Sequence, residues 1–374
     1  MPRTFYLVAG EHSGDTRGVE LMEALRGRWP DCVFRGLGGP QMAAFSDGGV
    51  EDWVDEAAVV GVWEVLRKYG YFKNRLEGAK RDVGRVDPDA LILVDYPGFN
   101  LRLAKAVRAA GCRARIVDYI TPQVWAWKKG RVFEMARYLD LACCLFPFEV
   151  SLFEAAGIRT VCIGHPLVQQ LEAARLHGGR EDKLVGLFPG SREREVARLF
   201  PVMLEAVTLL RRKNTGLRFI AAAASEHLRE MMEEMCRGQE GVELRCGNAH
   251  ELMQQATAGV VASGTATLEA AYYGLPHCLI YKVAWPTYLA GRVLVKIDFI
   301  GMANILAGRM VAPEFIQDEA EGGTISSFLE SVLEDEGRRA VLTRDLQKAA
   351  GQLGEGDAAA RGADAVYHLL EGDD

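Results

Sequence analysis

Short runs of apolar, β-favouring residues alternate with longer segments of helical periodicity along nearly the whole chain. Apolar runs of four to eight residues are typical of buried strands, and apolar positions three and four apart are typical of amphipathic helices. Their regular alternation indicates parallel sheets whose strands are connected by crossover helices. We therefore predict an α/β protein.

The apolar runs fall into two series, and each predicts one Rossmann-like, doubly wound parallel sheet. Strands are predicted in the first series at 4–9, 32–37, 90–95, 115–120 and 141–146, and in the second at 183–188, 217–223, 242–246, 259–262 and 278–281. The segment 164–180 lies between them, and its Gly, Pro and charge content is typical of an interdomain linker.

We place the first domain at 1–170, the second at 171–350 and a C-terminal helical tail at 351–374. Within the tail, 358–370 has a helical pattern and can pack against either domain. Two such domains are expected to face each other across a cleft, with ligands outside the carboxyl ends of the strands.

Composition narrows the function classes. The chain has 374 residues, of which 49% are hydrophobic and 25% charged, a globular profile. Its 44 Lys and Arg against 51 Asp and Glu give a net charge of −7, so a nucleic-acid partner is not expected and any anion must be bound by a local site.

No apolar run approaches the roughly 18 residues of a membrane span, and the run 5–10 is too short for a signal-peptide core. We expect a cytoplasmic protein.

Two polar features of the first half are candidates for chemistry. The loop after the first strand carries Glu11, Ser13, Gly14 and Asp15 and precedes a helix from about residue 16; it either presents groups to a ligand or caps that helix. Asp95 ends a buried strand, where partial desolvation suits a general base, although it can equally cap the next helix.

Two aromatic segments of the first half each allow two interpretations. Gln123 and Trp125 lie in a loop with a second tryptophan and two lysines, which either forms a wall for a sugar or acyl chain or packs the loop onto the domain. The stripe 58–72 is apolar with a basic fringe, which suits either an anionic membrane surface or buried core.

Two strand–turn–helix junctions in the second half suit a diphosphate. The first contains Gly190, Ser191 and Arg192, and the second contains Ser263, Gly264, Thr265 and Glu269. Glycines permit close backbone approach, helix N-termini offer unpaired N–H groups, and the guanidinium adds a cation with forked donors. Glu269, one turn into its helix, is placed to accept hydrogen bonds from ribose hydroxyls. Plain helix capping by Ser263 and Thr265 is the alternative.

As a set, these segments resemble the lipid-A-disaccharide synthases, inverting glycosyltransferases with the GT-B fold of two Rossmann domains. The matching segments occur in family order and cover most of the chain: VAGEHSGD at 8–15, VDYPGFN at 94–100, TPQVWAWKKGR at 121–131, GHPL at 164–167, FPGSR at 188–192, SGTATLEA at 263–270 and NILAGR at 304–309. One departure is His12, where the family's G-E-x-S-G-D has a small residue.

The resemblance implies a cytoplasmic, membrane-peripheral enzyme of lipid A synthesis. The family joins UDP-2,3-diacylglucosamine to 2,3-diacylglucosamine 1-phosphate, giving a β-1,6-linked disaccharide 1-phosphate and UDP. It implies partners of three kinds: acylated glucosamine lipids, UDP, and the cytoplasmic face of the inner membrane. No cofactor is implied, and the resemblance leaves a homodimer open.

The resemblance also assigns roles to residues. Asp95 matches the family's proposed base. Gly190, Ser191, Arg192, Ser263, Gly264, Thr265 and Glu269 match nucleotide-binding segments, and Asn304 and Gln317 match positions implicated in UDP contact or activity. The family's apolar membrane surface corresponds here to Val59, Val62, Trp63 and Leu66.

Inversion by single displacement follows if Asp95 removes the acceptor's proton while the two second-half junctions stabilise the leaving diphosphate. The chain has no D-x-D pair suited to holding a metal on a sugar diphosphate, so we predict no metal. Two other functions remain open: a UDP-N-acetylglucosamine 2-epimerase-like isomerase, and a nucleotide-sugar-binding protein without turnover.

Overall fold

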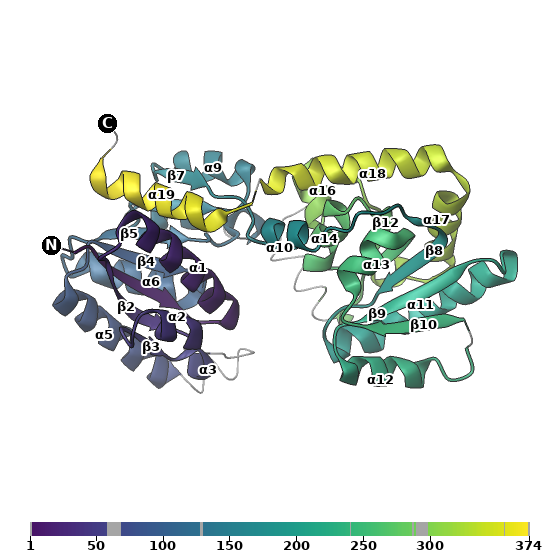
Figure 1. Cartoon of the computed structure of the whole chain (residues 1–374), viewed down its shortest axis with the longest axis horizontal. Coiled ribbons are helices and arrows are strands. Elements are labelled where there is room, and N and C mark those ends of the chain that lie inside the picture. Colours follow the sequence, from purple (N-terminus) through teal and green to yellow (C-terminus); the bar gives the residue numbers. More distant parts are fainter. Residues whose placement is uncertain are drawn as a thin grey trace. The chain divides into compact units, whose positions relative to one another are not determined.

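A computed structural model describes residues 2–57, 69–127, 130–239, 241–285, 288, 298–354 and 356–372. The chain divides into two compact units, one of Met1–Leu167 with Gly354–Asp374 and the other of Val168–Leu353. Each unit is built on one parallel sheet flanked by helices (Figure 1). The prediction of two Rossmann-like α/β domains is confirmed. No helix that the structure describes combines the length and apolar composition that crossing a bilayer requires.

The sheet of the first unit has the order β3-β2-β1-β4-β5-β6-β7. The five longer strands match the predicted runs, whereas the three-residue edge strands β3 and β7 were not predicted. The strands are β1 Thr4–Ala9, β2 Val33–Gly38, β3 Val50–Asp52, β4 Ala90–Val94, β5 Arg115–Tyr119, β6 Leu141–Cys144 and β7 Thr160–Cys162. The helices that the structure describes in this unit are α1 His12–Arg28, α2 Pro40–Phe45, α3 Val54–Ala57, α5 Tyr69–Val86, α6 Pro97–Ala109, α7 Val124–Trp127, α8 Arg131–Met135, α9 Pro147–Glu154 and α19 Ala358–Glu371.

Both faces of this sheet are buried, which explains why its central strands are continuous apolar runs. In β4, Leu91 and Leu93 contribute to the core on one face, and Ile92 and Val94 contribute to the core on the other. The alternation follows from the two-residue period of a strand.

The C-terminal helix α19 packs on the first unit, beside α1 (Figure 1). Gly362 allows this close approach, because a Cβ atom there would lie 2.6 Å from the ring of Tyr119. At the end of the helix, Glu371 accepts hydrogen bonds from the indole of Trp29 at 3.2 Å and from the guanidinium of Arg3 at 3.0 Å. Helix α19 therefore contributes to the first unit's core, through Ala358, Ala363, Ala365 and Val366.

The sheet of the second unit has the order β10-β9-β8-β11-β12-β13. Its strands are β8 Glu181–Phe188, β9 Arg218–Ala223, β10 Val242–Cys246, β11 Ala256–Ala262, β12 His277–Tyr281 and β13 Glu314–Ile316. Its helices include α10 Leu167–Ala173, α11 Glu193–Lys213, α12 Glu226–Met235, α13 Ala249–Gln255, α14 Thr265–Tyr272, α16 Met302–Ala307, α17 Gly322–Glu334 and α18 Glu336–Ala350, with 3₁₀ turns at η1 Gln317–Glu319 and η2 Gly351–Leu353.

The segment 164–180 is more structured than a linker, because it contains α10 and ends on Arg180. The guanidinium of Arg180 donates hydrogen bonds to the carbonyls of Met253, Gln254 and Ala256, at the end of α13, and to the carbonyl of Tyr273, at the end of α14. One side chain thus satisfies the otherwise unpaired carbonyls of two helix C-termini.

In each sheet, the order in which the chain adds strands reverses once. In the first unit the strand order reverses between β1 and β4, and in the second unit it reverses between β8 and β11. At such a switch point the loops after the two central strands separate, leaving a crevice outside their carboxyl ends. Asp95 follows β4, and Ser191 and Ser263 follow β8 and β11, so candidate residues of both units lie at switch points.

The buried imidazole of His277 is expected to make stability fall in acid. Its Nδ1 lies 2.7 Å from the carbonyl oxygen of Leu275, its Nε2 has no partner, and burial lowers its pKa to about 4. The unfolded chain, with an ordinary histidine pKa near 6.5, binds this proton first as the pH falls. We expect this group to reduce the free energy of unfolding by about 1 kcal/mol between pH 6 and pH 5.

Urea unfolding at several pH values measures this slope. The His277→Leu variant is expected to have a shallower slope between pH 6 and pH 4 than the native protein. Equal slopes in the native protein and His277→Leu would contradict the assignment.

Candidate functional site

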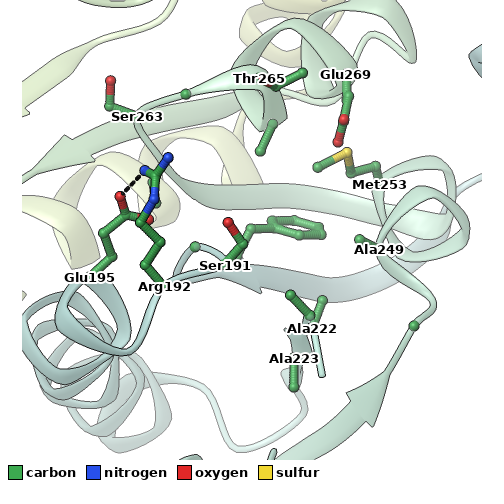
Figure 2. Close-up of a pocket in the computed structure, with 17 residues that line it drawn as sticks. Ser191, Arg192, Glu195, Ala222, Ala223, Ala249, Met253, Ser263, Thr265 and Glu269 are labelled. Atoms are coloured by element: carbon green, nitrogen blue, oxygen red, sulfur yellow. Dashed lines mark hydrogen bonds and ion pairs between the residues drawn. The ribbon is translucent and has the colours of Figure 1, made fainter. Parts of the chain in front are cut away.

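A cavity of about 450 Å³ opens at the carboxyl ends of β8, β9 and β11 in the second unit (Figure 2). It is lined by both predicted diphosphate junctions: Gly190, Ser191 and Arg192 after β8, and Ser263, Gly264, Thr265 and Glu269 after β11. Ala222 and Ala223 of β9 and Ala249 and Met253 of α13 complete much of the wall. The structure therefore brings these seven predicted donor-site residues together.

Two helices begin at this cavity without a side-chain cap. The N-cap residue of α11 is Arg192 and that of α14 is Gly264, and neither makes a capping hydrogen bond through a side chain. Ser263 and Thr265 therefore do not serve as the N-cap residue of α14. Unpaired N–H groups and the positive ends of two helix dipoles favour a bound anion at this position.

Glycine is needed at both junctions because the backbone turns sharply there. Gly190 has a φ of 108° and Gly264 a φ of 139°, values that residues with a Cβ rarely adopt. At Gly190 an added Cβ would also lie 2.7 Å from a carboxylate oxygen of Glu195. The two turns thus let the backbone approach a ligand closely.

The cavity has a cationic end and an acidic end. Arg192 Nη1 lies 2.7 Å from Glu195 Oε1, and its guanidinium retains further N–H donors for an anion. Figure 2 shows Glu269 away from this pair, beside Met253. Burial raises the pKa of Glu269, and the neighbouring His250 opposes that rise. This polarity can accommodate an anion at the Arg192 end and hydrogen-bond donors at the Glu269 end.

Asn304 and Gln317 are not among the residues that line this cavity. Asn304 is buried and donates to Ala312 O and Glu314 Oε1 while accepting from the N–H groups of Val311 and Ala312. Gln317 makes a reciprocal pair of hydrogen bonds with the backbone of Val283. These side-chain atoms are occupied within the chain, so both residues brace the loops around β12 and β13. Their role in UDP contact or activity stays a prediction.

In the first unit, Asp95 follows β4 in an unusual backbone conformation. Asp95 and Tyr96 have φ values of 48° and 51°, a left-handed arrangement that costs about 1 kcal/mol or more at each non-glycine residue. The amide of Asn100 donates to the Asp95 carbonyl at 2.6 Å and to the carbonyl of Val8 at 3.1 Å, which ties the ends of β4 and β1 together. Strain held in this way is typical of functional sites.

The carboxyl groups of Asp95, Glu11 and Asp118 all have raised pKa values, and the charge of Asp95 contributes to the shifts of the other two. Burial raises the pKa of Asp95, with an N–H of Tyr96 acting in the opposite direction. Burial and the charge of Asp95 raise the pKa of Glu11, the N-cap residue of α1. Burial, and then Asp95, raise the pKa of Asp118 on neighbouring β5 well above its ordinary value, and its Oδ2 has no hydrogen-bond partner. A carboxylate with a raised pKa is a stronger base.

The first loop begins the helix earlier than predicted, at His12 instead of about residue 16. Ser13 is exposed, whereas Gly14 and Asp15 are buried. The Asp15 carboxylate accepts hydrogen bonds from the backbone N–H groups of Gly39, Gln41 and Met42, so it caps α2. His12 Nε2 lies 3.3 Å from Asp55 Oδ1 on the surface.

The aromatic loop is anchored through a buried carboxylate. Gln123 is exposed, but Trp125 is buried and its indole N–H donates to Glu149 at 2.8 Å. Glu149 also accepts from the N–H groups of Leu145 and Phe146 at the start of α9, and burial raises its pKa to about 7. Of the two predicted roles for Trp125, the structure shows the one in which it packs the loop onto the domain.

The proposed membrane residues Val59, Val62, Trp63 and Leu66 lie outside the described residues. Among the His, Cys, Asp and Glu side chains of the described ranges, no group of three or more is arranged to hold a metal ion.

Sequence reasoning missed four side chains around these sites. Asp118 could have been found from the sequence, because it is the one acidic residue in an apolar strand. Glu149 could also have been found, because Pro147 and Glu149 together are typical of the start of a helix. No local sequence pattern points to Arg180 or His250, because the groups that they contact are distant in the sequence.

The comparison with known families agrees with this arrangement. Residues 5–365 match the family model described as lipid-A-disaccharide synthetase. The chain belongs to this family. It is 41% identical over 380 residues to the lipid-A-disaccharide synthase of Geobacter metallireducens, covering 97% of this chain and 96% of the relative. It is 38% identical to that of Trichlorobacter lovleyi, covering 99% and 98%. Membership in the lipid-A-disaccharide synthase family makes the chain a glycosyltransferase of lipid A biosynthesis.

Solved structures support the fold at low sequence identity. A UDP-N-acetylglucosamine 2-epimerase assigned as putative in Listeria monocytogenes has a TM-score of 0.61 at 12% identity, covering 100% of this chain and 98% of the other. The S. aureus MnaA–UDP co-structure has a TM-score of 0.60 at 12% identity, covering 99% and 97%. CalG4, the calicheamicin glycosyltransferase, has a TM-score of 0.57 at 15% identity, covering 99% and 98%. This chain therefore has the GT-B glycosyltransferase fold.

Proposed function

We propose that the protein transfers a 2,3-diacylglucosamine unit from UDP to the primary hydroxyl of 2,3-diacylglucosamine 1-phosphate. The products are the β-1,6-linked disaccharide 1-phosphate and UDP. Family membership supports the reaction class, and the observation that carries the mechanism is the position of Asp95, a partly buried carboxylate with a raised pKa at the switch point of the first sheet.

Asp95 acts as the general base in this proposal. Its carboxylate takes the proton of the acceptor hydroxyl while the hydroxyl oxygen forms a bond to the anomeric carbon of the donor. The bond between that carbon and the diphosphate oxygen breaks at the same time, and UDP leaves with the electron pair. Attack on the face opposite the leaving group inverts the configuration. Burial favours this role, because it raises the pKa of Asp95 and a carboxylate with a higher pKa is a stronger base.

The second unit supplies the donor site. The N-termini of α11 and α14 and the guanidinium of Arg192 stabilise the charge that develops on the leaving diphosphate. These groups do for the diphosphate what a divalent cation does in other transferases, so we expect transfer to need no added metal. Glu269 accepts hydrogen bonds from the ribose hydroxyls.

Acylated substrates place the reaction at a membrane surface. We propose that the protein is peripheral on the cytoplasmic face of the inner membrane, which it contacts through the apolar segment that includes Val59, Val62, Trp63 and Leu66. Such an apolar stripe with basic neighbours suits an anionic bilayer surface.

A transfer assay in detergent with EDTA tests this function. The native protein is expected to convert UDP-2,3-diacylglucosamine and 2,3-diacylglucosamine 1-phosphate into the disaccharide 1-phosphate and stoichiometric UDP. Folded protein that binds UDP but forms no disaccharide would contradict the proposal. Epimerised UDP-N-acetylglucosamine would identify the isomerase alternative, whose solved representatives share only the fold with this chain.

A further inference from the structure

His250 lies outside the wall of the donor cavity but touches one of its functional groups. It is on α13, between Ala249 and Met253, which both line the cavity. Its Nε2 lies 3.4 Å from Oε2 of Glu269 on α14. The two side chains are 35% and 17% exposed, so the pair is shielded from water more than a surface ion pair.

The imidazole is fixed in place by its surroundings. Its ring packs against Tyr273 at a centroid separation of 5.8 Å and an angle of 57°. Tyr273 follows Glu269 by four residues and so lies on the same side of α14. Its hydroxyl donates to the carbonyl of Leu171 at 3.0 Å, which anchors the ring. His250 is therefore held between the carboxylate that faces the cavity and an aromatic ring that cannot move freely.

The Glu269 carboxylate needs such support to bind a nucleotide. A vicinal diol donates two hydrogen bonds, and only an ionised carboxyl group accepts both without offering a competing proton. Burial disfavours the ionised form of Glu269, whereas His250 favours it. The cationic Arg192 pairs instead with Glu195, at the other end of the cavity (Figure 2).

We propose that His250 is a positioning residue that holds the Glu269 carboxylate ionised and oriented to accept hydrogen bonds from the ribose hydroxyls of a uridine nucleotide. This inference rests on the proposed function, since it requires that the cavity binds UDP. His250 touches Glu269 and not the nucleotide, so its effect is transmitted through the carboxylate alone.

Calorimetric titration with UDP and with 2′,3′-dideoxy-UDP separates this role from a general structural one. His250→Leu is expected to weaken UDP binding about tenfold, as for loss of one hydrogen bond to a charged group. It is expected to leave the affinity for 2′,3′-dideoxy-UDP unchanged, because that nucleotide lacks the hydroxyls. His250→Gln, which retains a side-chain N–H donor, is expected to recover most of the UDP affinity.

The chain offers a matched control in His227, whose Nε2 lies 2.7 Å from Glu193 Oε1 in an exposed pair outside the cavity. His227→Leu is expected to bind both nucleotides as the native protein does. Equal weakening of both nucleotides by His250→Leu, or native affinity of that variant for UDP, would overturn the inference. A native protein that fails to bind UDP would instead contradict the proposed function.

Discussion

Replacing Asp95 with Asn is expected to lower kcat for disaccharide formation at least about a hundredfold, the usual contribution of a general base. Asn keeps the shape of the side chain and tolerates the positive φ of this position, but its amide cannot accept the acceptor's proton. The Kd for UDP is expected to stay unchanged, because the donor cavity is built entirely from residues of the second unit. Steady-state kinetics and UDP titration measure the two effects separately.

Asp47 provides the matched control for Asp95. It also has a positive φ, 52°, but it is exposed in a turn after α2. Asp47→Asn makes the same chemical change in a similar backbone conformation and is expected to retain native kcat. If Asp95→Asn retained kcat within a few-fold of native while folded, the base would have to be another group, and Asp95 would be left with the backbone role that its strained turn indicates.

Replacing Arg180 with Ala is expected to lower the free energy of unfolding of the second unit by about 4 kcal/mol. The substitution removes the donor from four carbonyl groups at the ends of α13 and α14, and each carbonyl left without a partner costs roughly 1 kcal/mol or more. Burial lowers the pKa of Arg180 to about 10, and the hydrogen bonds to the four carbonyl groups hold the guanidinium in place.

Hydrogen exchange of peptides from β11 and α14 in increasing urea locates this loss within the second unit. Arg180→Lys, with three donors on a flexible stem, is expected to lose less than Arg180→Ala. Arg218→Ala is the control, since its exposed pairs with Glu181 and Glu243 are worth at most about 1 kcal/mol. A loss at Arg180 no larger than at Arg218 would show that water replaces the guanidinium at these helix ends.

The strands were predictable where both sheet faces bury them. β4 is apolar at every position, and β11 is buried at every position with Thr257 as its one polar side chain, so both stand out without an alternating pattern. The edge strands β3, β7 and β13 have three residues each, too few to show any period. Local pattern therefore predicted the centre of each sheet and the five-residue edge strand β10, and it missed the three short edge strands.

The site could be predicted where its functional groups lie within a few residues of one another in the sequence. Each junction after β8 and β11 has its glycine, hydroxyl and helix start within a few residues, and the structure brings them into one cavity. The roles of Asp15, Asn304 and Arg180 depend on partners in other elements. In a sequence, a polar residue that braces the backbone looks the same as one that contacts a ligand.

The order in which the chain is synthesised gives the placement of α19 a further consequence. Residues up to Leu167 leave the ribosome first, but the helix that covers α1 and the ring of Tyr119 belongs to the last part of the chain. Roughly 200 residues must be translated in between, which takes about 10–40 s at common elongation rates. During that interval the apolar surface beneath α19 stays open to water, so this face of the nascent first unit is the one we expect a ribosome-associated chaperone to bind.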